Sequence, residues 1–274
     1  MCILFIYRNP NAASESYRLI LASNRDEYLK RPSLPAHYWK DHPQCIGGTD
    51  MEPGKEGGTW LAVSLNGKAG IILNLTNEAS VTNIPKQGRG FLVPNFVASK
   101  NSATSYLNKL HEENNKKQIY NPFVLVLVNL LTADVNYLSS SETSTGPDLA
   151  QENILGFSNS GLNIPFKKVE AGKEMFKTII KDTKVSKQTD LIEKLLTFLK
   201  SKERYLPDPE LERRCPVKYK ELSSICVVTD GYGTRTHSIL LVNGRNEMTF
   251  VEETLMPDLT WKRQVFNNKL LCET

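Results

Sequence analysis

The chain has 274 residues, of which 40% are hydrophobic and 23% charged, the balance of a globular protein rather than of a disordered or membrane-embedded one. Its 34 basic and 30 acidic side chains leave a net charge of +4, and the basic residues are scattered, which argues against binding to nucleic acid. The longest strongly apolar run, 123–131, is about half of what a membrane-spanning helix needs, so we expect no transmembrane segment.

The cysteines are widely spaced, odd in number and form no CxxC motif, which favours free thiols over a disulfide framework or a zinc site. They are Cys2, Cys45, Cys215, Cys226 and Cys272. The apolar N-terminal run stops at Arg8-Asn9-Pro10, which is too short for a signal peptide. We therefore expect a protein that stays inside the cell, with import into an organelle left open.

The first half of the chain predicts two β-hairpins. Residues 2–7 and 18–23 are β-branched or aromatic runs on either side of a turn-rich loop, which predicts an antiparallel pair. Residues 60–65 and 69–75 flank Asn66-Gly67, the favoured two-residue hairpin turn.

The middle of the chain predicts helices followed by strands. Apolar residues recur at helical spacing over 90–115, with a break near 100–101 that indicates two helices. The continuous apolar run 123–130 predicts a strand buried on both faces, with 135–138 as its partner.

The last third predicts two helices, 171–181 and 189–202, and then three strands. The strands are 224–229, 237–242 and 248–252, with a turn at Asn243-Gly244. Strands at both ends, paired helices between them and no βαβ alternation favour antiparallel sheets covered by helices. No repeat or linker divides the chain, so we predict a single domain over residues 1–274.

Cys2 is the strongest candidate for chemistry. Removal of Met1 would place a free α-amine beside its thiol, and this amine can serve as the nucleophile's own general base. The alternative is a strand cysteine packed as a small hydrophobe. Arg25 and Asp26 end the second strand beside the start of the first, where they could lower the pKa of a thiol or orient an amine; the alternative is a salt-bridged strand end.

Several motifs in order along the chain carry a resemblance to a known family. They are Met1-Cys2-Ile3-Leu4, Asn24-Arg25-Asp26-Glu27, Gly57-Gly58-Thr59-Trp60-Leu61, Leu75-Thr76-Asn77, Gly156-Phe157-Ser158-Asn159 and Gly233-Thr234-Arg235-Thr236. Together they resemble the NRDE family, named for its tetrapeptide, and within it the transport and Golgi organisation type. The match runs from one end of the chain to the other.

The resemblance implies an N-terminal nucleophile hydrolase-like fold of the α+β class, a four-layer αββα sandwich of two antiparallel sheets flanked by helices. In amidases of that fold an N-terminal cysteine attacks an amide, while nearby groups steer it and stabilise the oxyanion. The positions that look like those parts are Cys2, Arg25, Asp26, Asn77, Asn159 and Arg235. A cysteine amidase or thioesterase that needs no cofactor is therefore one expectation, although membership of a fold does not establish chemistry.

The leading expectation from the resemblance is an intracellular haem-trafficking protein linked to protein secretion and Golgi organisation. Such a protein would be cytoplasmic, with a mitochondrial or Golgi-associated location left open. Its partner would be haem or another small amphipathic ligand, and peripheral association with a membrane is compatible with it. A scaffold at secretory membranes is a third reading.

A haem site needs an apolar cleft, cations for the propionates and a His, Cys, Met or Tyr ligand. Cys215-Pro216 resembles a short haem-regulatory pattern, although such dipeptides also arise by chance. His37 and His42 flank Tyr38-Trp39 in a proline-rich segment that we expect to be a loop, bearing either a ligand or an aromatic plug. His111 is expected to be solvated on a helix, and His237 to be structural at the start of a strand.

Overall fold

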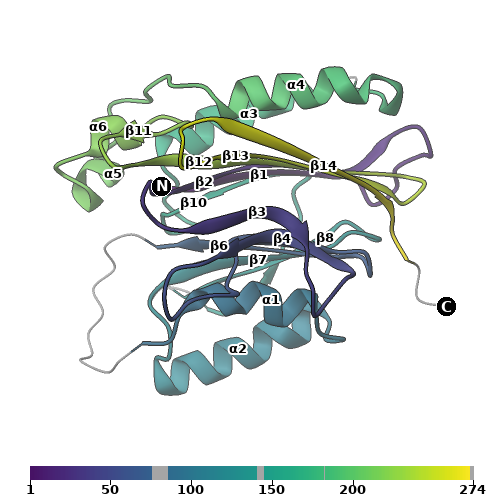
Figure 1. Ribbon diagram of the computed structural model, residues 1–274, viewed down its shortest axis with the longest axis horizontal. Helices are drawn as coiled ribbons and strands as arrows, with labels where there is room; N and C mark the ends of the chain where they lie inside the picture. The colour runs from purple at the N-terminus through teal and green to yellow at the C-terminus, as the bar shows by residue number, and fades with distance from the viewer. Residues whose placement is uncertain (76–85, 141–144, 182, 272–274) are drawn as a thin grey trace. The chain divides into compact units, whose positions relative to one another are not determined.

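Two antiparallel sheets, each with helices on one face, organise the chain (Figure 1). The computed structural model describes residues 1–75, 86–140, 145–181 and 183–271. These residues form two compact units, of which the first comprises Met1–Lys30 and Glu152–Lys269 and the second Arg31–Gln151 with the residues from Leu270 onward. The single domain expected over the whole chain stays a prediction.

The first unit contains the sheet β10-β1-β2-β12-β13-β14, with β11 paired to β12, and all neighbours are antiparallel. Its strands are β1 (Ile3–Arg8), β2 (Tyr17–Tyr28), β10 (Ile154–Ser158), β11 (Val228–Thr229), β12 (Tyr232–Asn243), β13 (Glu247–Leu255) and β14 (Trp261–Lys269). In this sheet Ile3 lies opposite Asn24 on one side and Ser158 on the other. The predicted N-terminal hairpin is confirmed, and it brings the chain terminus beside the NRDE tetrapeptide.

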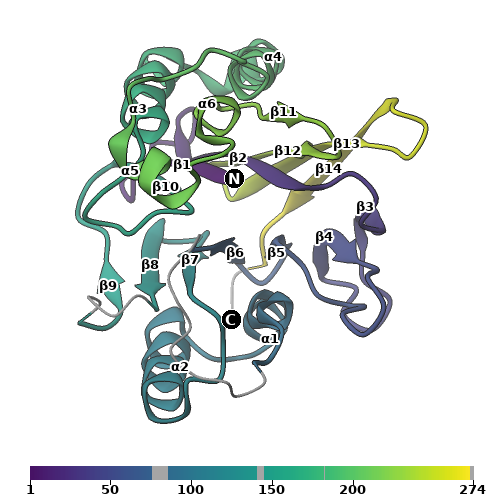
Figure 2. The same cartoon turned by 90° about the vertical axis from the view of Figure 1, so that its left-hand side faces the viewer.

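Helices α3 (Lys167–Ile180) and α4 (Gln188–Leu199) cover one face of this sheet (Figure 2). Phe5 from β1, Phe176 from α3 and Phe198 from α4 form an aromatic cluster between them, with ring centroids 5.1–6.3 Å apart. Both predicted helices are confirmed, although α3 begins before residue 171 because Asp208 Oδ2 accepts the backbone N–H of Lys167 at 2.8 Å. The short helices of this unit are η2 (Val185–Lys187), α5 (Pro209–Arg214) and α6 (Tyr219–Leu222).

The second unit contains the sheet β3-β4-β5-β6-β7-β8-β9. Its strands are β3 (Ser33–Tyr38), β4 (Cys45–Asp50), β5 (Leu61–Ser64), β6 (Lys68–Asn74), β7 (Phe123–Asn129), β8 (Asp134–Ser139) and β9 (Asp148–Leu149), and its helices are η1 (Arg89–Phe91), α1 (Leu92–Val97) and α2 (Ala103–Lys117). The turn between β5 and β6 has three residues, 65–67, and not the two expected: the Gly67 N–H donates to the Ser64 carbonyl oxygen at 3.0 Å, and Gly67 has φ +81°, the left-handed conformation that closes such a loop. The second hairpin, the two helices and the buried β7 strand are therefore confirmed.

Two histidines lie at positions other than those expected. His37 belongs to strand β3 and not to a loop, because Pro35 is accommodated at the edge of the sheet, where a missing N–H costs no ladder hydrogen bond. His237 lies in the middle of β12, because that strand starts at Tyr232 to pair with the far end of β2. His42 lies in the connection between β3 and β4, as predicted.

The expected pair of antiparallel sheets flanked by helices is confirmed, while the stacking of four layers stays a prediction. Within the residues placed by the structure, no helix combines the length and the apolar character needed to cross a lipid bilayer.

Gly172 on α3 marks the closest approach between that helix and the first sheet. A Cβ at this position would lie much closer to Phe5 Cζ than two carbon atoms in van der Waals contact, and the ring of Phe5 is held by Phe176 and Phe198. We expect Gly172→Ala to lower the free energy of unfolding by about 1–3 kcal/mol in denaturant titrations, because overpacking outweighs the gain in helix propensity. Gly161→Ala, whose new Cβ meets nothing within 4 Å, is the matched control and should change it by less than about 0.5 kcal/mol. Equal stability of the two variants would contradict the packing argument.

Candidate functional site

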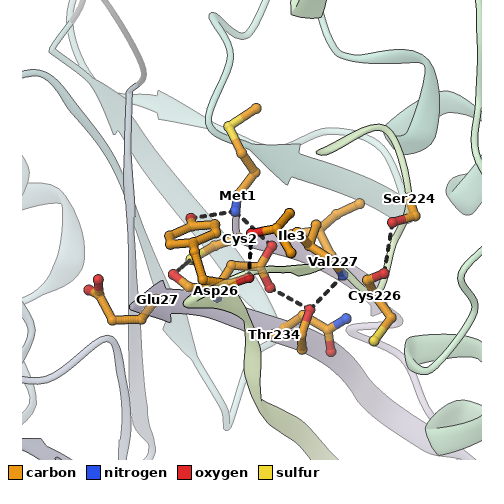
Figure 3. A network of polar contacts seen from close by, with 12 residues as sticks. Met1, Cys2, Ile3, Asp26, Glu27, Ser224, Cys226, Val227 and Thr234 are labelled. Carbon is orange, nitrogen blue, oxygen red and sulfur yellow. Dashed lines mark hydrogen bonds and ion pairs between the residues drawn. The ribbon is translucent and has the colours of Figure 1, made fainter. Parts of the chain in front are cut away.

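The N-terminal amine is held by the first sheet (Figure 3). Met1 N donates hydrogen bonds to Asp26 Oδ2 and to the Tyr232 hydroxyl, both at 2.7 Å. The second carboxylate oxygen of Asp26 accepts the Thr234 hydroxyl at 2.6 Å. The Met1 side chain is only 4% exposed and belongs to the apolar core of the unit. The first residue of the chain is thus bound as an integral part of the fold.

The Cys2 thiol lies against the backbone of Asp26. Its Sγ accepts the Asp26 N–H at 3.3 Å and donates to the Asp26 carbonyl oxygen at 3.7 Å. Burial raises the pKa of the Cys2 thiol, and the neighbouring Met1 ammonium opposes this rise. Because the thiolate is the reactive form, Cys2 is a poor nucleophile while Met1 is attached, and its own nitrogen is then an amide without basic character.

The four residues of the NRDE tetrapeptide are divided between the two faces of β2. Side chains alternate along a strand, so Asn24 and Asp26 share one face while Arg25 and Glu27 share the other. The Nη2 atom of Arg25 lies 3.7 Å from Oε2 of Glu27, as expected for two side chains on the same face. Arg25 and Asp26 are therefore adjacent in sequence but do not form one side-chain pair.

The structure places the remaining predicted catalytic residues around the same end of the first sheet. Arg235 lies at a register shift in β12 next to the pairing with Arg25, and it donates to the Tyr28 carbonyl oxygen at 3.1 Å. Asn159 directly follows Ser158, the partner of Ile3, so it lies at the level of Cys2. Both side chains are buried. Asn77 lies outside the described residues, and the catalytic roles of the whole set stay predictions.

Lys168 on α3 is a fully buried lysine that sequence reasoning missed. Its Nζ donates to the Met1 carbonyl oxygen at 3.3 Å and to the Ser224 carbonyl oxygen at 3.0 Å. Burial lowers the pKa of Lys168. The sequence signal for its burial was its position four residues before Gly172, which places both residues on the helix face that meets the sheet.

Asn24 fixes the protonation pattern of His237. The Asn24 Nδ2 donates to the carbonyl oxygens of Leu199 at 2.8 Å and Ile225 at 3.0 Å, so its Oδ1 must act as an acceptor. Oδ1 lies 2.7 Å from His237 Nδ1, which therefore carries the proton. Burial lowers the pKa of His237 to about 4, so the imidazole is neutral at pH 7. Its ring stacks on Trp261 with centroids 4.6 Å apart.

His237 lines a pocket of about 410 Å³ in the first unit, which we call the His237 pocket. The lining residues are Leu29, Lys200, Lys202, Cys226, Val227, Val228, Thr229, Tyr232, Gly233, Thr234, His237, Leu255 and Trp261. The volume lies within the range of small-molecule sites. Sequence reasoning missed this pocket because its walls come from strands and loops far apart in the chain.

The predicted haem ligands lie elsewhere. His37 and His42 meet at one pocket of about 570 Å³ in the second unit, together with Trp39 and the polar residues Lys40 and Asp41. Cys215 follows α5 and packs against the core of the first unit, where burial raises the pKa of its thiol. His111 lies on α2 as expected. Over the ranges that the structure describes, no three His, Cys, Asp or Glu side chains are clustered to hold a metal ion.

The ion pair between the terminal amine and Asp26 is expected to stabilise the first unit. Asp26→Asn removes the charge that faces a buried ammonium, and loss of one partner of a buried pair typically costs about 3–5 kcal/mol. We expect a decrease of about 3 kcal/mol in the free energy of unfolding, measured by denaturant titration. Glu174→Gln, at an exposed carboxylate 4.0 Å from Lys177, is the control and should change it by less than about 0.5 kcal/mol. A loss below about 1 kcal/mol in Asp26→Asn would show that the pair contributes little.

Two solved structures resemble the chain at low identity. One is a Caenorhabditis elegans N-acylethanolamine-hydrolyzing acid amidase ortholog, with 9% identity, a TM-score of 0.49 and coverage of 88% of this chain and 92% of that one. The other is the C2A mutant of a conjugated bile acid hydrolase from Clostridium perfringens, with 8% identity, a TM-score of 0.44 and coverage of 98% and 92%. The activities in these names belong to those two proteins. The fold of the present chain is assigned from the sheets and helices described above.

Sequence relatives are much closer. The human Transport and Golgi organization protein 2 homolog is 35% identical over 275 residues, covering 97% of this chain and 98% of the relative. The Drosophila melanogaster Transport and Golgi organization protein 2 is 36% identical over 264 residues, covering 93% and 92%. The family model described as Transport and Golgi organisation 2 matches residues 1–257. The predicted resemblance is confirmed: the chain belongs to the Transport and Golgi organisation 2 family.

Proposed function

We propose that this protein binds haem inside the cell and passes it between compartments, in support of secretion and Golgi organisation. The observation that carries the proposal is the His237 pocket, which combines apolar walls with basic residues at its margin. The proposed location is the cytoplasm, with the mitochondrion and the Golgi as the compartments served. Haem is the cargo in this proposal and not a catalytic cofactor.

The chemistry of the His237 pocket suits an amphipathic anion. Leu29, Val228, Leu255 and Trp261 supply apolar surface for a macrocycle. Lys202 is exposed and makes no ion pair with any residue that the structure places, so it is available to a propionate. A small number of polar groups on an apolar lining is the usual composition of a small-molecule site.

Haem titration followed by optical spectroscopy tests the proposal. The purified protein should give a saturable shift of the Soret band, and the bound haem should move to an excess of apomyoglobin. Cys2→Ala should bind and transfer equally well, because this function does not use the thiol. A titration without saturation, or cargo that never reaches the acceptor, would count against haem trafficking.

A second function, cysteine amidase or thioesterase activity, is favoured by the position of Lys168. The carbonyl oxygen and nitrogen of one peptide bond lie roughly 2.3 Å apart, so the 3.3 Å contact of Lys168 Nζ with Met1 O places the Cys2 nitrogen at most about 5.6 Å from that cation. If Met1 were removed, this cation would lower the pKa of the new Cys2 amine and favour its neutral, basic form.

The resulting chemistry would be self-contained. The Cys2 amine would take the thiol proton as the sulfur attacks a substrate carbonyl carbon. The bond to the leaving amine or thiol would then break as that group receives the proton, which leaves a thioester on Cys2. Water would hydrolyse this thioester and free the thiol. The unprocessed chain cannot begin this cycle, because the Cys2 nitrogen is then part of a peptide bond.

Intact mass analysis combined with Cys2 labelling tests this second function. The cellular protein should lack Met1, and an electrophilic thioester probe should label Cys2 at neutral pH. Lys168→Met should shift the pH profile of labelling upward, because the amine regains its ordinary pKa. Cys215→Ser is the control and should leave labelling unchanged. A retained Met1 with an inert Cys2 would exclude the activity.

A further inference from the structure

His237 has one buried nitrogen without a structural role. Its Nδ1 donates to Asn24, but Nε2 has no hydrogen-bond partner among the residues that the structure places, and it is closed to solvent. A buried polar atom without a partner costs on the order of 1–3 kcal/mol, so its presence calls for an explanation. A core position of this kind would be filled at lower cost by an apolar side chain.

The unpartnered Nε2 of His237 presents a lone pair in a fixed direction. Because Asn24 Oδ1 can only accept, the proton stays on Nδ1 and Nε2 stays unprotonated. An imidazole oriented by a hydrogen bond from its other nitrogen is the usual arrangement of a histidine that binds a metal. The first residue of the NRDE tetrapeptide thus holds His237 in the form a metal centre requires.

The surroundings select the kind of metal centre. The side chains lining the pocket that can ligate haem iron are His237, Cys226 and Tyr232; burial raises the pKa of the Cys226 thiol, and the Tyr232 hydroxyl already accepts a hydrogen bond from the Met1 ammonium, so His237 is the donor left for a metal. One nitrogen donor in an apolar pocket is insufficient for a bare cation, but it suffices for iron whose other four ligands belong to a porphyrin. The exposed cation Lys202 lies at the same pocket.

We propose that His237 Nε2 is the axial ligand of haem iron, with the macrocycle against the apolar wall of the His237 pocket and a propionate at Lys202. The inference rests on the proposed haem function and assigns it a site. Coordination uses a lone pair that is already free, so no proton is released. Trp261, 41% exposed and stacked on the imidazole, must move away from the ring to admit the porphyrin.

Haem spectra of matched variants test the assignment. His237→Gly removes the ligand and leaves room for free imidazole, while His237→Gln keeps a donor to Asn24 without an imidazole nitrogen. The double variant His37→Ala/His42→Ala removes the competing histidines at the other pocket. Circular dichroism establishes that each variant is folded, and iron-free protoporphyrin IX separates iron ligation from binding of the macrocycle.

Both His237 variants should lose the spectrum of ligated haem, and their affinity for haem should fall at least about tenfold. Loss of even an outer-sphere partner of a metal ligand typically lowers metal affinity about 10–100-fold. Added imidazole should restore the spectrum of His237→Gly, and the double variant should match the wild type. Protoporphyrin IX should bind the wild type and His237→Gln alike.

Four outcomes would overturn the assignment. If both His237 variants keep the wild-type spectrum, or if the double variant alone loses it, haem binds elsewhere and the proposed function survives without this site. If His237→Gly and His237→Gln are both unfolded, His237 is a structural residue and not a ligand. If the wild-type protein itself binds no haem, the proposed function falls together with the site.

Discussion

The ion pair between the terminal ammonium and Asp26 is the contact on which the organisation of the site depends. It joins the start of β1 to β2, and through Tyr232 and Thr234 to β12, so three strands of one sheet converge on the first residue. It also determines which chemistry is available. With the amine of Met1 in this position, the Cys2 nitrogen is an amide, and burial raises the pKa of the Cys2 thiol, so neither group is set up for nucleophilic attack in the untrimmed chain.

The alternation of side chains along β2 explains how one tetrapeptide contributes to two environments. Asn24 and Asp26 point to the face that carries the helices, where the first orients His237 and the second holds the amine. Arg25 and Glu27 lie on the opposite face. A motif that looks like a single catalytic cluster in sequence is therefore two pairs of residues with separate partners, and substitutions within it are expected to have separate consequences.

Local patterns in the sequence predicted the elements that local forces specify. Asn66-Gly67 fixed a hairpin, and the apolar spacing over 90–115 fixed two helices, because these signals depend on neighbouring residues. The position of Cys2 beside Asp26 followed from the first hairpin alone. The environments of Lys168 and His237 could not be identified in this way, because each side chain has a hydrogen-bond partner more than 50 residues away in the chain. The orientation of His237 depends on Asn24, and nothing in the sequence indicates that these two residues are hydrogen-bonded.

The contact between the Met1 amine and Tyr232 can form only late in the synthesis of the chain. Synthesis runs from the N-terminus, and the partners of the Met1 amine include Tyr232, 231 residues later in the chain. Until β12 has left the ribosome, the first residue cannot be secured and stays accessible to a methionine-removing peptidase. Once the sheet closes, the same residue is out of reach. Removal of Met1 would therefore have to precede the pairing of β12 with β2, because the completed sheet buries the residue that is removed.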